Sequence, residues 1–71
     1  MERFFINQRN NDAVTIGGVR SLTDFSPEQI MVGVGGAFIT VAGEKLRIRR
    51  FDENEIEITG KVASVITERK R

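Results

Sequence analysis

Apolar residues at every second position constrain the fold of this chain more than any other feature. The spacing occurs in 14-VTI-16, 39-ITV-41 and 56-IEI-58, where one polar residue separates two β-branched ones. Successive side chains of a strand point to opposite faces, so this period predicts strands with one buried face. β-Branched residues also favour a pleated surface. No apolar stripe of helical period continues for three turns, and we therefore predict an all-β fold.

The expected strands are short and about seven in number. They lie near residues 13–16, 19–23, 29–34, 37–42, 45–50, 55–59 and 62–67. The residues expected to face the core are Val14, Ile16, Leu22, Phe25, Ile30, Val32, Ile39, Val41, Leu46, Ile48, Phe51, Ile56 and Ile58. A chain of 71 residues is near the lower size at which domains fold unaided. We therefore expect a protein partner or a homo-oligomer to add to the buried surface.

An offset of 26 residues suggests an internal pseudo-repeat. It aligns 25-FSPEQI-30 with 51-FDENEI-56. The Ser26-Pro27 pair resembles a helix start, but the matching segment is an acidic turn, and we predict a turn in both places. Two copies of a strand–turn–strand unit favour a small β-sandwich with an Ig-like two-sheet architecture. One strongly coiled sheet and a small β-barrel are the alternatives.

Three glycines, Gly33, Gly35 and Gly36, fall within four positions. A dinucleotide-binding loop needs a third glycine and a following helix, whereas 37-AFITV-41 has the period of a strand. The Gly-Lys-Ser/Thr of a phosphate-binding loop is also missing. We predict a two-residue hairpin with a primed turn at Gly35-Gly36, and a bulge or close approach at Gly33.

Composition excludes most catalytic chemistry. The chain has no Cys and no His, so disulfides, imidazole or thiolate metal sites and Cys/His nucleophile pairs are absent. Carboxylates cluster at Asp52, Glu53, Glu55 and Glu57, but we expect these to be exposed, where two carboxyls are not driven into separate acid and base roles. We predict no catalytic residue, no cofactor, no metal and no enzymatic activity.

Basic residues alternate in 45-KLRIRR-50, which predicts that Lys45, Arg47 and Arg49 share one strand face. The candidate partner contacts are Lys45, Arg47, Arg49 and Arg50. The alternative is a solvated strand face whose charges protect an edge. Nucleic acid is a less favoured partner, because single-strand binders interleave cations with exposed aromatic residues and the chain has no Tyr or Trp. A small β-barrel that binds nucleic acid through 45–50 and the C-terminal cations is the alternative function.

We divide the chain into a polar N-terminal leader at 1–12, a single all-β domain at 13–67 and a basic tail at 68–71. The leader has only a short apolar run at Phe4-Phe5-Ile6, unlike a secretory signal, whose apolar core has about 7–15 residues. No run approaches the roughly 18 apolar residues of a membrane span. A cytoplasmic protein without membrane insertion is expected.

The order of 15-TIGGVRSLTDFSPEQIMV-32, 39-ITVAGEKLRIRRF-51 and 56-IEITGKVASVI-66 resembles the YabP/YqfC family of bacterial spore-formation proteins. The resemblance covers about residues 13–67, and the short chain is more similar to YqfC-type members. It implies a small all-β protein of the mother cell that takes part in spore envelope or coat morphogenesis. It also implies a protein partner, a sporulation membrane or coat protein, and no catalytic residue. The basic strand at 45–50 and the glycines at 33–36 depart from the family pattern.

Overall fold

The computed structural model describes residues 4–69. Residues 1–3 of the expected leader, and Lys70 and Arg71 of the expected tail, lie outside the described residues. The described chain is all-β, as predicted, and its strands are β1 (Phe5–Arg9), β2 (Ala13–Gly17), β3 (Val19–Ser26), β4 (Gln29–Val34), β5 (Ala37–Asp52) and β6 (Glu55–Arg69).

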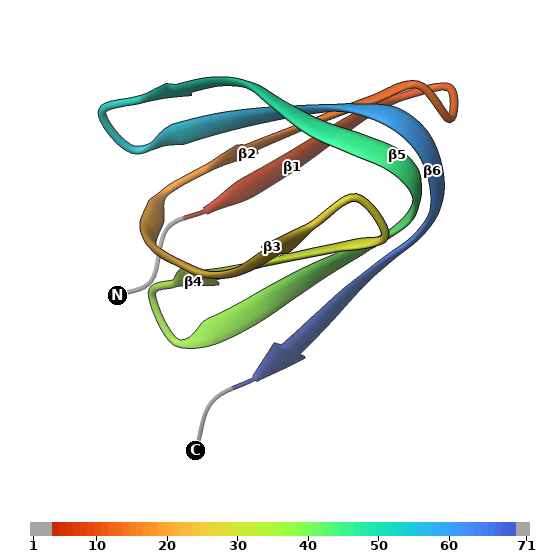
Figure 1. The fold of residues 1–71 in the computed structure, drawn as a ribbon. Coiled ribbons are helices and arrows are strands. Elements are labelled where there is room, and N and C mark those ends of the chain that lie inside the picture. The colour runs from red at the N-terminus through yellow and green to blue at the C-terminus, as the bar shows by residue number, and fades with distance from the viewer. Residues whose placement is uncertain (1–3, 70–71) are drawn as a thin grey trace.

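These strands form one antiparallel sheet in the order β1-β2-β6-β5-β4-β3. β5 and β6 are long and bend near their middles, so the sheet folds over and its two halves face each other (Figure 1). The first half holds β1, β2, residues 55–59 of β6 and residues 47–52 of β5. The second half holds β3, β4, residues 37–42 of β5 and residues 64–69 of β6. The described chain is thus one open, folded sheet, which agrees with the alternative of a single strongly coiled sheet and not with two separate sheets or a closed barrel.

The strand count differs from the prediction for two reasons. The segments expected as strands at 37–42 and 45–50 form the single strand β5, and those at 55–59 and 62–67 form β6. Gly43 and Gly60 fall between the segments expected as separate strands, but the strands continue through them and bend there. In addition, residues 5–9 of the expected leader form β1, which pairs with β2 from Phe5↔Gly17 to Arg9↔Ala13.

The two bends bring the backbones of β5 and β6 into close approach. A Cβ atom at Gly43 would collide with the carbonyl oxygen of Lys61, and one at Gly60 would collide with that of Lys45. Gly60 also has φ of 132°, which L-residues rarely adopt. The ladder shifts register between Ala42 and Gly43 and again between Glu44 and Arg47, as bulges do where a strand curves.

Each bend is closed by the turn of a neighbouring hairpin. The turn between β3 and β4 accepts hydrogen bonds from β5, and the loop between β1 and β2 accepts them from β6. The N–H groups of Gly43, Leu46, Gly60 and Val62 donate to the carbonyls of Glu28, Pro27, Asp12 and Asn11 at 3.0, 2.8, 3.1 and 2.9 Å, respectively. Backbone groups left unpaired by the bulges therefore find partners.

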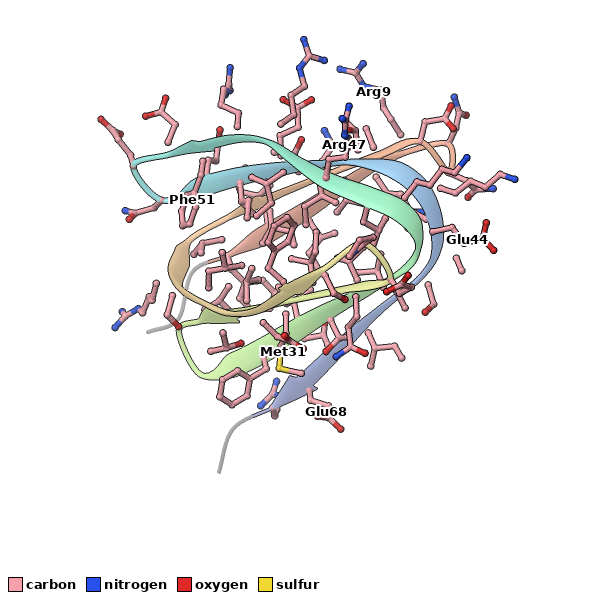
Figure 2. The ribbon with its side chains drawn as sticks, in the orientation of Figure 1. Arg9, Met31, Glu44, Arg47, Phe51 and Glu68 are labelled. Carbon is pink, nitrogen blue, oxygen red and sulfur yellow. The ribbon has the colours of Figure 1, made fainter. Side chains whose placement is uncertain are left out.

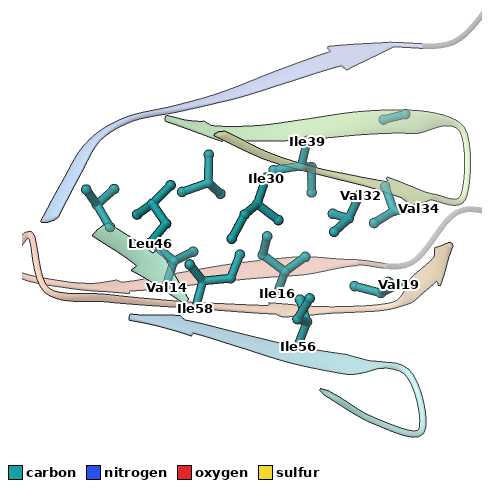
Figure 3. Packing of buried hydrophobic residues seen from close by; sticks show 13 residues of the cluster. Val14, Ile16, Val19, Ile30, Val32, Val34, Ile39, Leu46, Ile56 and Ile58 are labelled. Carbon is teal, nitrogen blue, oxygen red and sulfur yellow. The ribbon is translucent and has the colours of Figure 1, made fainter. Parts of the chain in front are cut away.

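The core fills the space between the two sheet halves (Figure 3). Nine of the residues expected to face the core are buried, namely Val14, Ile16, Ile30, Val32, Ile39, Val41, Leu46, Ile56 and Ile58. Ile48 is partly buried against them. Val19, Val34, Ala37 and Val62 are also buried.

Three residues expected in the core are exposed instead: Leu22 is 37%, Phe25 54% and Phe51 47% exposed. Their cross-strand partners are Val32, Ile30 and Ile56, which are fully buried, so all three lie on the core-facing side of the sheet. β3 is an edge strand, and residues 47–52 of β5 pair only with β6. Alternation of apolar residues thus predicted the correct face of the sheet for these three side chains. It did not predict their exposure, which arises because the opposite half of the sheet does not cover the edges on which they lie.

The hairpins match the turn predictions, with one correction. Val34 pairs with Ala37 across Gly35-Gly36, as expected, but only Gly36 has positive φ, at 80°. That sign pattern fits a type II turn and not the primed turn that was predicted.

The segments aligned by the 26-residue offset both form two-residue turns, since Ser26 pairs with Gln29 and Asp52 with Glu55. No helix forms at Ser26-Pro27. The offset is not confirmed as a repeat of the whole sheet, which is a single array of six strands.

Candidate interaction surface

The basic residues expected to contact a partner are all exposed. They lie in the C-terminal part of β5: Lys45, Arg47, Arg49 and Arg50. They do not share one face in the predicted way, because bulges between Glu44 and Arg47 and between Ile48 and Arg50 interrupt the alternation. Lys45 has φ of 54°, a left-handed conformation within the first bulge. Arg47 pairs with Thr59 and Arg50 with Glu57, and these two arginines therefore lie on the outer face.

The outer face of the first sheet half is basic at one end. A cross-strand row runs from Arg9 through Ala13 and Thr59 to Arg47, and Figure 2 shows Arg9 and Arg47 on the same outer side. Arg9 was missed in the sequence because β1 was assigned to the leader. Its signal was weak, since only Ile6 marks the core-facing side of that strand.

Acidic residues at the other end of this face compensate the cations only in part. The Arg50 guanidinium lies 3.9 Å from the Glu55 carboxylate, and the two side chains are 63% and 45% exposed. An exposed ion pair of this kind contributes only about 0–1 kcal/mol. This ion pair is therefore too weak to prevent the Arg50 guanidinium from contacting an anionic group of a partner.

β3 and residues 47–52 of β5 are edges of the two sheet halves and form no ladder with each other. Two backbone hydrogen bonds join their ends. The Val19 N–H donates to the Asn54 carbonyl at 2.8 Å, and the Leu46 N–H donates to the Pro27 carbonyl at 2.8 Å. Val19 and Pro27 are eight positions apart along the chain, and so are Leu46 and Asn54, so the two free edges have matching length and run in opposite directions.

Apolar side chains line the space between these two joined ends. We call this line of residues the apolar seam: Leu22 and Phe25 from β3, and Ile48 and Phe51 from β5. Figure 2 shows Phe51 projecting from the first sheet half towards the second. A hollow of about 410 Å³ lies at one end of the seam, lined by Pro27, Lys45, Leu46 and Arg47.

Side chains of the neighbouring strands lie over Gly33 at the glycine hairpin. A Cβ atom at Gly33 would lie 2.7 Å from the Ser21 hydroxyl and 3.6 Å from the ring of Phe38, which is the cross-strand partner of Gly33. The β4–β5 ladder is regular at Gly33, and the register shift in the β3–β4 ladder places its extra residue in β3, between Val19 and Ser21. Gly33 is therefore a close-approach position opposite a bulge in β3. Phe5 covers Gly17 in the same way at the β1 edge.

A second hollow lies outside the bends of β5 and β6. Its volume is about 470 Å³, and its lining consists of Asn11, Asp12, Gly43, Glu44, Lys61, Val62 and Ala63. Glu44 and Lys61 are cross-strand partners there, and Asp12 adds a second carboxylate to the lining. Within residues 4–69, no group of three or more Asp and Glu residues is arranged to hold a metal ion.

The described residues contain no helix long and apolar enough to cross a membrane.

A model of the YabP family matches residues 3–71. This range covers nearly the whole chain, including β1, and the chain therefore belongs to the YabP family. Comparison with curated proteins and with solved structures gave no match.

Proposed function

We propose that the chain is a non-enzymatic sporulation protein, an interaction module that acts in spore envelope or coat morphogenesis. Membership of the YabP family carries this proposal. The partner is a sporulation membrane or coat protein, and the site of action is the cytoplasm of the mother cell. Within the family, the chain is of the YqfC type.

The surface supports binding through a sheet edge or face. Large apolar side chains on the core-facing side remain 37–54% exposed at Leu22, Phe25 and Phe51. Exposed apolar groups mark interaction sites where they form a contiguous patch. A domain of this length also gains from any partner that covers its core.

Deletion of the gene in its spore-forming host tests the proposed role. We expect the number of heat-resistant spores to fall, with recovery when the unaltered gene is restored. A strain restored with Ile66→Ser, which changes a 53% exposed apolar residue outside the group named above, should recover the yield and serves as a control for the effect of an exposed apolar-to-polar change. A normal yield of heat-resistant spores in the deletion strain would contradict the role.

A further inference from the structure

We propose that the apolar seam between β3 and β5 is the docking site for an extended, acidic segment of a partner protein. The segment adds as a strand to the free edge of β3 or β5, sets apolar side chains against the seam and places carboxylates beside the arginines of β5. This inference rests on the proposed function only in taking the partner to be a protein.

The first observation is the pair of matched, unpaired strand edges. Within the described part of the chain, β3 has no neighbour besides β4, and residues 47–52 of β5 have none besides β6. The Val19–Asn54 and Leu46–Pro27 bonds hold the ends of these edges together. An edge of this kind offers backbone donors and acceptors to an incoming strand, which is how extended peptides join sheets.

The second observation is the position of the apolar groups between the joined ends. The equal spacing places Leu22 level with Phe51, and Phe25 level with Ile48. All four pair across the sheet with buried core residues, so they continue the core into the opening. Alternate side chains of an added strand would point inward and cover them.

The third observation fixes the charge of the occupant. Residues 19–26 and 45–52 together carry five cations, at Arg20, Lys45, Arg47, Arg49 and Arg50, and two carboxylates, at Asp24 and Asp52. The turns at the joined ends add Glu28 and Glu53, and Glu55 pairs with Arg50, so the excess of positive charge lies along residues 45–50 of β5, which contain four cations and no carboxylate. Asp24 is already contacted by the Gln29 side-chain amide at 3.5 Å. Charge complementarity of this kind favours acidic partners and disfavours basic ones.

Two other occupants of the seam can be distinguished from a peptide by experiment. A second copy of the chain would fill the seam by dimerisation, and nucleic acid would contact the arginines without using the apolar groups. The balance favours a peptide, because the seam supplies strand edges, apolar groups and cations in one place.

The experiment selects binders from a display library of random nine-residue peptides, with the full chain as bait. We expect enrichment of sequences that alternate acidic and apolar residues and lack proline. The best enriched peptide, labelled with fluorescein, then reports the dissociation constant by anisotropy. Phe25→Ser and the double variant Arg47→Glu/Arg49→Glu are each expected to weaken binding at least about tenfold, whereas Ile66→Ser changes it less than about twofold.

Phe25 and Ile66 are matched in exposure, at 54% and 53%, so a general effect of replacing an exposed apolar residue should appear in both variants. Urea unfolding of each variant distinguishes lost binding from lost folding. The arginine variant leaves the apolar groups intact and therefore tests the seam independently. No enrichment, enrichment of basic peptides, or equal weakening by Ile66→Ser would overturn the proposal. A dimer in sedimentation that Phe25→Ser dissociates, or tighter binding of a mixed-sequence oligonucleotide than of the peptide, would overturn it in favour of the other occupants. Peptide binding with normal spore yield on deletion would refute the proposed function alone, and impaired sporulation without peptide binding would refute the seam alone.

Discussion

At the scale of single residues, the bends of β5 and β6 depend on two glycines, which have no side chain. Gly43 and Gly60 lie where the backbone of one long strand approaches that of the other, and the atoms they would strike are carbonyl oxygens, which cannot rotate away. In the sequence, both glycines fall between segments that were expected as separate strands. A single sequence shows that a glycine is present, but not whether a turn, a positive φ or a close approach requires it.

Gly60→Ala should be strongly destabilising. Its φ of 132° and the contact with Lys45 together predict a loss of at least about 2 kcal/mol in the free energy of unfolding, measured by urea denaturation. Gly33→Ala is the matched control, because the nearest atom there is the Ser21 hydroxyl, which can move to another rotamer. That variant should lose less than about 1 kcal/mol. Equal losses for the two variants would show that the bend does not depend on Gly60.

At the scale of elements, β1 changes the boundary of the domain. All five of its residues are in register with β2, Ile6 packs against the core and Phe5 covers Gly17. The polar run that follows hides this strand in the sequence, because Asn-rich composition indicates a loop more strongly than one apolar residue indicates a strand. The family match from residue 3 onward agrees with a domain that includes β1.

Removal of residues 1–9 should therefore weaken the domain. Loss of the β1 ladder and of the contacts of Ile6 should lower the free energy of unfolding by about 2 kcal/mol or more, and the exposed edge of β2 should promote association. Gln8→Ala in the full chain, a change at an exposed position of the same strand, is the control, because it alters one side chain of β1 and keeps the strand. Unchanged unfolding and a monomeric truncated protein would return residues 1–9 to the status of a leader.

At the scale of the whole molecule, alternation predicts the class of fold and the face of nearly every core residue, but it does not predict strand neighbours. Val14, Ile30 and Ile58 needed only their period to be placed. The exposure of Phe25 and Phe51 depends on which edges the folded sheet leaves open, and no pattern within a strand contains that information. The seam could not be predicted for the same reason, although the arginines beside it could.

Hydrogen exchange of the backbone amides, free and with the selected peptide bound, tests the central claim most directly. In the free protein, seam-facing amides of residues 20–25 and 47–51 should exchange at least about a hundredfold faster than those of Val14–Ile16 and Ile56–Ile58, which lie in paired strands. Binding should slow the seam amides at least about tenfold and leave residues 64–68 of β6 unchanged. Slow exchange at the seam in the free protein, or new protection confined to β6, would contradict the account.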